Sequence, residues 1–166
     1  MIIDLRNLEL HPGSREEFTL ESRGDEALLK DLPGRFLASV QLVIMVQNAG
    51  HCFKGQGRLE TRVELNCARC LENLIYPIST EFQFTVASEA EDHALQEGDI
   101  LPYGDGQVDL EPLVNELIVT ELPLTPLCQA ECRGLCPLCG SNKNTHRCNC
   151  KDHSIDPRWE KLNKLR

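Results

Sequence analysis

Cysteines gather late in the chain at spacings that suit a metal ion. Six of the nine fall in one short segment: Cys128, Cys132, Cys136, Cys139, Cys148 and Cys150. Zinc prefers four thiolate or imidazole ligands in a tetrahedron, and a C-x-x-C turn supplies two of them from one loop. In "CPLCG", Pro137 restricts the turn, and Gly140 can adopt the positive φ that points backbone N–H groups at the sulfurs. We therefore predict a structural zinc site built on Cys136 and Cys139.

The sequence leaves open which cysteines complete this site. Two pairs flank the turn and either could close the shell: Cys148 with Cys150, or Cys128 with Cys132. Six thiols exceed one four-ligand shell by two, and Cys67 and Cys70 in "CARC" would raise the number to eight. We expect one zinc ion per chain. A second ion, held with the help of Cys67 and Cys70, is the alternative.

Other uses of these thiols fit the sequence less well. An iron–sulfur cluster also takes four cysteines, but the ferredoxin spacings are absent. A thioredoxin-like pair would open a helix after a strand, which the C-x-x-C motifs do not. The first residues, "MIIDLRNLEL", lack the basic and long apolar regions of a secretory signal, so we expect a reducing, cytoplasmic location in which disulfides are rare.

Charge is distributed unevenly along the chain. The net charge is -9, but residues 1–132 carry 9 basic against 23 acidic residues, whereas residues 133–166 carry 8 basic against 3 acidic. An acidic body disfavours bulk attraction to nucleic acid, while a basic tail can contact phosphate locally. Candidate contacts to RNA or to a partner protein are Arg69, Arg133, Lys143, Arg147, Arg158, Trp159 and Lys161.

No catalytic constellation is visible in the sequence. The chain has no P-loop, nucleophile elbow, H-E-x-x-H helix or dinucleotide fingerprint. A catalytic zinc keeps an open coordination position and usually draws on histidine and carboxylate ligands, whereas this tail offers an excess of sulfur. We expect a protein that is not an enzyme and has neither a small-molecule substrate nor a membrane span.

The remaining segments predict an α+β fold with an antiparallel sheet covered by one or two helices. Strand patterns occupy 36–46, 58–66 and 74–86, and the last two flank "CARC" as a hairpin. Apolar residues at helical spacing predict a helix at about 110–122, with Asp109 as its cap, after an acidic, solvated loop at 88–106. The expected domains are a sheet domain, 1–126, and a zinc-knuckle-like tail, 127–166, that ends in a short basic helix.

Four segments in this order resemble the YceD family of large ribosomal RNA subunit accumulation proteins. They are "LNCARCLE", "LPLTPLCQAECRGLCPLCGSNKN", "CNC" and "IDPRW". The loop after the C-x-x-C turn reads Asn142-Lys143-Asn144, where the family usually has N-L-N. The first 60 residues match the family only in general layout.

The resemblance implies a non-enzymatic ribosome biogenesis factor that supports accumulation or maturation of large-subunit ribosomal RNA. Its partner would be that RNA, an assembly intermediate or a ribosomal protein. It also implies that any zinc serves local structure, because some members lack the tail cysteines. The alternatives are a zinc-ribbon interaction module unrelated to ribosomes and an enzyme of RNA maturation.

Overall fold

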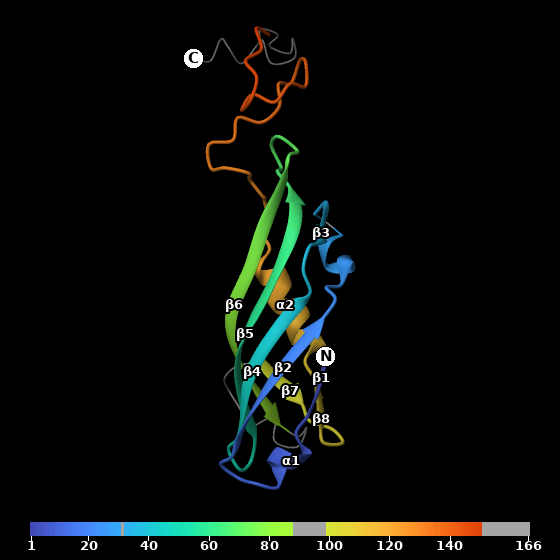
Figure 1. Cartoon of the computed structure of the whole chain (residues 1–166), viewed down its shortest axis with the longest axis vertical. Coiled ribbons are helices and arrows are strands. Elements are labelled where there is room, and N and C mark those ends of the chain that lie inside the picture. Colours follow the sequence, from blue (N-terminus) through green and yellow to red (C-terminus); the bar gives the residue numbers. More distant parts are fainter. Residues whose placement is uncertain (31, 88–98, 151–166) are drawn as a thin grey trace, which may run out of the picture.

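A computed structural model describes residues 1–30, 32–87 and 99–150, and its centre is a long, twisted sheet (Figure 1). Five strands follow the order β2, β4, β5, β6, β7, and a sixth, β3, also pairs with β5. Their bounds are β2 Arg15–Ser22, β3 Gly34–Phe36, β4 Val40–Asn48, β5 Phe53–Asn66, β6 Asn73–Ala87 and β7 Asp99–Pro102. A sheet with few helices agrees with the predicted α+β class.

Shorter elements surround this sheet. Two short strands form a separate antiparallel pair, and the helical segments are a single turn, a 3-10 turn and one longer helix: β1 Ile2–Asp4, β8 Gln107–Asp109, α1 Arg6–Glu9, η1 Glu26–Leu29 and α2 Glu111–Glu121. None of the helices in the described residues has the length and apolar content of a membrane span.

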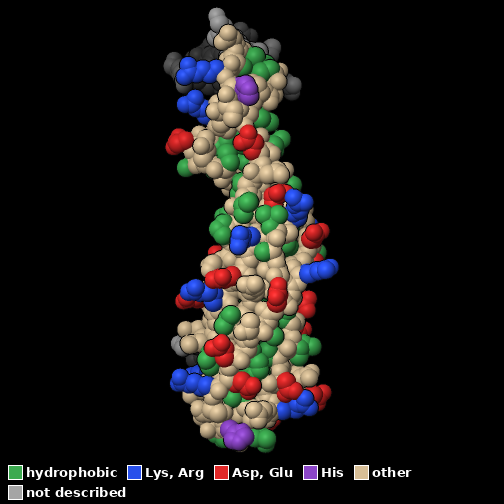
Figure 2. All heavy atoms as spheres, viewed as in Figure 1, with side chains coloured by type: hydrophobic (Ala, Val, Ile, Leu, Met, Phe, Trp, Pro, Cys, Tyr) green, Lys and Arg blue, Asp and Glu red, His purple; other side chains and the backbone are tan. Residues whose placement is uncertain are grey.

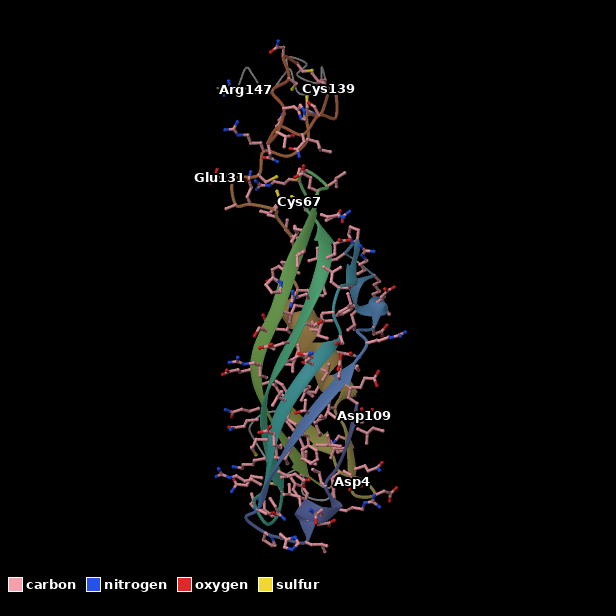
Figure 3. All side chains as sticks on the ribbon, viewed as in Figure 1. Asp4, Cys67, Asp109, Glu131, Cys139 and Arg147 are labelled. Atoms are coloured by element: carbon pink, nitrogen blue, oxygen red, sulfur yellow. The ribbon has the colours of Figure 1, made fainter. Side chains whose placement is uncertain are left out.

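The β5–β6 hairpin is the longest feature of the sheet and was predicted from the sequence. Its antiparallel register runs from Phe53 opposite Val86 to Asn66 opposite Asn73. Alternation decides which side of β5 faces the core, since Leu59, Val63 and Leu65 are fully buried while the charged residues between them are not. The hairpin tip projects beyond the other strands and carries Cys67 and Cys70 (Figures 1 and 3).

The predicted strand at 36–46 is two strands in the structure. Phe36 lies opposite Val63 in β3, whereas Gln41 lies opposite Glu60 in β4, so the register shifts by two residues between them. Within this bulge Thr61 Oγ1 donates to the Ala38 carbonyl at 3.1 Å. The apolar run is continuous across the bulge, which is why periodicity does not reveal it.

Strand β7 corrects two predictions. The sequence predicts a strand-free acidic loop at 88–106 and a purely antiparallel sheet, but Asp99–Pro102 pair with β6 in parallel. Leu101 is buried there, only 8% exposed, and packs in the main core. Four residues are too few for alternation to be recognised in a sequence. The rest of the predicted loop, 88–98, lies outside the described residues.

Helix α2 lies across one face of the sheet, behind it in Figure 1. Leu113, Val114 and Ile118 are buried, and the helix contacts β6 and η1. The N-cap residue is Leu110 and not the predicted Asp109, which lies one residue earlier, but the Asp109 carboxylate accepts the Glu111 N–H of the first turn at 2.9 Å. Beyond the helix the chain turns toward the hairpin tip, and the predicted C-terminal helix lies outside the described residues.

Candidate metal centres

The structure sorts eight cysteines into two groups of four. The proximal group is Cys67, Cys70, Cys128 and Cys132, and the distal group is Cys136, Cys139, Cys148 and Cys150. Within each group the four sulfur atoms all lie within 4.8 Å of one another. The sequence left open which pair joins Cys136 and Cys139, and the structure brings Cys148 and Cys150 to them. Cys128 and Cys132 instead meet the hairpin tip, and Cys52 is buried elsewhere.

Sulfur spacing in the proximal group suits a metal ion and not a disulfide. Cys67 Sγ lies 3.7 Å from Cys132 Sγ, and Cys70 Sγ lies 3.5 Å from Cys128 Sγ. A tetrahedral zinc ion with Zn–S bonds of about 2.3 Å places its sulfurs about 3.8 Å apart, whereas a disulfide requires about 2.05 Å. Four thiols with these separations fit a zinc ion, and the distal set offers the same four donors.

Both groups are built on the same backbone turn, which we call a knuckle. In the proximal knuckle the Leu71 N–H donates to the Cys67 carbonyl at 2.9 Å, and the Cys67 N–H donates to the Glu72 carbonyl at 2.8 Å. In the distal knuckle, residues 136–141, the equivalent bonds have the same lengths, from Gly140 to Cys136 and from Cys136 to Ser141. The two turns therefore match position by position.

One position of the knuckle demands a left-handed backbone. The residue after the second cysteine has φ of 71° at Gly140 and of 61° at Leu71. Glycine adopts this conformation without strain, whereas in a leucine the close contact between Cβ and the backbone costs free energy. Leu71 is also 62% exposed, so burial of its side chain does not explain its presence there. The sequence does not indicate this strain, because "CLE" has leucine at the position where the distal knuckle has glycine.

Hydrogen-bond donors favour the thiolate form of two proximal cysteines, Cys67 and Cys132. Burial raises the pKa of Cys67, but N–H groups of Cys128, Cys70 and Arg69 outweigh it and lower the pKa to about 6. Burial also opposes ionisation of Cys132, yet the Asn144 amide and the Gly134 N–H hold its pKa below the usual value. Thiolates are the form that binds a metal.

The remaining proximal thiols resist ionisation while no cation neutralises their neighbours. Burial, together with the sulfurs of Cys70 and Cys132, raises the pKa of Cys128 to about 12. A divalent cation at the centre would reverse this balance, because it attracts each thiolate more strongly than the thiolates repel one another.

The distal group shows the same division. The Ser141 hydroxyl and N–H lower the pKa of Cys139 to about 6, whereas the neighbouring Cys139 sulfur, with a partial loss of solvation, raises the pKa of Cys150 to about 12. The distal group is more exposed to solvent, because Cys139 and Cys150 are exposed and, of its four cysteines, only Cys136 is buried. In the proximal group three of the four cysteines are buried.

Two asparagines connect the groups, and sequence reasoning did not assign them this role. The Asn144 amide donates to Cys132 Sγ at 3.3 Å and to Asn142 Oδ1 at 2.9 Å. The Asn142 amide donates to Glu72 Oε1 on the hairpin at 2.8 Å. The spacing Asn-x-Asn after a C-x-x-C turn was the available signal. Lys143 between them donates its backbone N–H to the Gly134 carbonyl at 2.9 Å, a bond that does not involve its side chain.

The predicted contact residues have different surroundings. Arg69 Nη1 donates to the Cys132 carbonyl at 2.9 Å, so this side chain links hairpin and tail. Arg133 and Arg147 are exposed and Lys143 is half-buried; Figure 2 shows Lys and Arg side chains at the distal end and also along the rest of this face. The other three predicted contacts, Arg158, Trp159 and Lys161, lie outside the described residues.

Comparison with known proteins covers both cysteine groups. A family model described as "Large ribosomal RNA subunit accumulation protein YceD" matches residues 55–166. The chain belongs to the YceD family. The match takes in the β5–β6 hairpin, α2 and the tail, which are the parts that build and hold the two cysteine groups. No solved structure matches the chain.

Relatives of this YceD-family chain come from bacteria and plants. An uncharacterized protein of Mycobacterium tuberculosis is 35% identical over 102 residues, which is 58% of this chain and 47% of the relative. A Bacillus subtilis protein, uncharacterized protein YlbN, is 31% identical over 104 residues, 61% of this chain and 59% of the relative. The chain thus spans about half the length of the mycobacterial relatives it matches.

A plant relative carries a name that states a role. The protein of Arabidopsis thaliana named "Large ribosomal RNA subunit accumulation protein YCED homolog 1, chloroplastic" is 30% identical over 60 residues, which is 36% of this chain and 19% of that protein. A protein of Zea mays with the same name is 34% identical over 55 residues, 32% of this chain and 19% of that protein.

Proposed function

We propose that this protein supports the accumulation or maturation of large-subunit ribosomal RNA as a non-enzymatic assembly factor. The observation that carries the proposal is membership of the YceD family over the hairpin, α2 and the tail. Its partner is the large-subunit RNA, an assembly intermediate or a ribosomal protein, and it acts in the cytoplasm where ribosomes assemble. The names of the plant relatives support this direction.

Charge supports an RNA contact at the distal end. Residues 127–150 contain three basic residues, Arg133, Lys143 and Arg147, and one acidic residue, Glu131. The sheet domain, by contrast, is strongly acidic. A few cations on an otherwise acidic molecule favour a local contact to phosphate over non-specific coating of RNA. Figure 3 places Arg147 at the end of the molecule remote from the sheet, where a large partner can reach it.

A zinc ion in the distal group would hold these cations in place. Four cysteine ligands from residues 136–150 fix the loop that carries Lys143 and Arg147. A shell filled by protein thiolates supplies structure and offers no open position to a substrate. This role agrees with a factor that binds and positions RNA and does not cut it.

The proposal is tested in a strain that lacks the protein. We expect a reduced large-subunit peak in ribosome profiles and less large-subunit RNA, both restored by the wild-type chain. The double variant Arg133→Glu/Arg147→Glu should restore neither, whereas Arg15→Glu, a single charge reversal at an exposed position of β2, should restore both. Normal profiles in the deletion strain would refute the proposal.

Catalysis is tested separately with the purified protein. Incubation with precursor large-subunit RNA should leave the RNA intact. Cleavage that a single side-chain substitution abolishes would show that the protein is an RNA-maturation enzyme instead.

A further inference from the structure

We propose that the proximal group, Cys67, Cys70, Cys128 and Cys132, is a second zinc site whose metal fastens the tail to the β5–β6 hairpin. The proposal rests on the geometry of these residues and is independent of any role in ribosomal RNA accumulation. It assigns the two cysteine groups different tasks: the distal metal shapes a loop, and the proximal metal joins two distant parts of the chain.

The first argument is where the ligands come from. The proximal group takes two cysteines from the hairpin tip and two from the segment after α2, and the paired sulfurs are 65 and 58 residues apart in the chain. The distal group takes all four from residues 136–150. A metal in the distal group therefore closes short loops, whereas a metal in the proximal group cross-links the tail to the sheet domain.

The second argument is that, among the described residues, little apolar packing holds the joint between the tail and the hairpin tip. Buried Cys67, Cys70 and Cys132 form a cluster apart from the main core, and the partly buried hydrophobic residues that pack on it in the described part of the chain are Leu74, Leu127 and Leu135. So small an apolar cluster contributes little free energy, and its centre consists of polar thiols. A cation bound by four thiolates supplies the missing attraction.

Hydrogen bonds across the joint show that it is shaped for docking. The Ala68 N–H donates to the Pro126 carbonyl at 2.8 Å, and the Leu135 N–H donates to the Arg69 carbonyl at 3.1 Å. Gly134 fits closely against the hairpin as well, because a Cβ there would lie 3.0 Å from the Arg69 carbonyl oxygen. These contacts orient the tail once it is held, and they depend on the tail remaining close.

The third argument is the internal comparison between the knuckles. The proximal knuckle repeats the backbone hydrogen bonds of the distal one, although it must force Leu71 into a left-handed conformation. A backbone that accepts strain to aim its N–H groups at two sulfurs is built for a ligand at those sulfurs.

Metal counting tests the proposal directly. Wild-type protein purified without added metal should contain two zinc ions per chain by elemental analysis. The double variant Cys67→Ser/Cys70→Ser should contain one, as should Cys136→Ser/Cys139→Ser, and the control Cys52→Ser should keep two because Cys52 belongs to neither group. A wild-type content of one ion, or two ions retained after loss of Cys67 and Cys70, overturns the proposal.

Hydrogen exchange tests the fastening. The Leu135 amide, which donates to Arg69 across the joint, should exchange at least tenfold faster in Cys67→Ser/Cys70→Ser. In the same variant the amides of the β5–β6 ladder near Phe53 and Val86 should keep their protection, which shows that the sheet is folded. Protection of Leu135 that survives removal of all zinc from wild-type protein contradicts the proposal, whatever the variants do.

Discussion

Asn144 donates its side-chain amide to Cys132 Sγ at 3.3 Å, and this bond reaches from the loop of the distal group to a ligand of the proximal group. The Asn144 Oδ1 atom also accepts the Arg133 N–H at 2.8 Å. One side chain thus fixes both the cysteine and the backbone next to it. Groups that donate to a metal ligand orient it and tune its charge, so their loss weakens metal binding without removing a ligand.

Replacement of Asn144 should therefore lower the zinc affinity of the proximal group. For Asn144→Ala we expect a loss of about 10- to 100-fold, measured by competition with a chelator, because Cys132 loses an N–H donor. The control is Lys143→Ala, whose backbone contact to Gly134 is unchanged by the substitution. Equal affinities in the two variants would show that the bond does not support the metal.

Relief of backbone strain should stabilise the proximal knuckle. Leu71→Gly should raise the free energy of unfolding of the joint by about 1 kcal/mol, because glycine adopts positive φ without the clash of a Cβ. Gly140→Leu should have the opposite effect in the distal knuckle, where the backbone has the same conformation. Local stability from hydrogen exchange measures both changes. If Leu71→Gly destabilises the joint, its side chain makes a contact that outweighs the strain.

Close packing in the sheet predicts a difference between two glycines. A Cβ at Gly55 would clash with the ring of Phe84, whereas a Cβ at Gly104 would meet nothing within 4 Å. Gly55→Ala should destabilise the sheet domain by about 1–3 kcal/mol through overpacking, while Gly104→Ala should have little effect. Urea unfolding followed by circular dichroism provides the comparison, and similar midpoints would mean that the Phe84 ring can move aside.

Acid should weaken the start of α2 through Asp109. The Glu111 N–H that this carboxylate accepts lowers the pKa of Asp109 below its usual 3.8. A carboxyl whose folded pKa is depressed contributes stability above the unfolded value and loses it as pH falls through the folded value. Between pH 5 and pH 2, Asp109→Asn should therefore lose less stability than wild type. Parallel loss in both proteins would assign the acid sensitivity to other groups.

Much of the sheet domain could be predicted from the sequence, because its signals are local. Strict alternation in 58–66 and 74–86 predicted β5 and β6 with Cys67 and Cys70 at their tip, and helical spacing predicted α2. Strand β2, the β1–β8 pair, the bulge between β3 and β4 and the parallel strand β7 were not predicted. The bulge leaves the apolar run unbroken, and β7 is too short to show a period.

The cysteine grouping could be predicted only in part, because it depends on where the chain goes after α2. The C-x-x-C spacing marked Cys136 and Cys139 as neighbours, but nothing local shows that Cys128 and Cys132 reach the hairpin tip. That contact follows from the length of the hairpin and the return of the chain along it (Figure 1). The role of Asn142 and Asn144 is equally non-local, since their partners include Glu72 across the joint.

Two separate apolar clusters imply that the molecule unfolds in stages. The main core and the small cluster at the hairpin tip share one partly buried side chain in the described residues, Leu74. Two regions unfold cooperatively when the unfolding of one breaks many contacts to the other. A single shared leucine provides few such contacts. Calorimetry should show a distinct transition for the tip, shifted by chelators while the sheet transition stays in place. The tail could then detach from the hairpin tip and dock again repeatedly while the sheet domain stays folded.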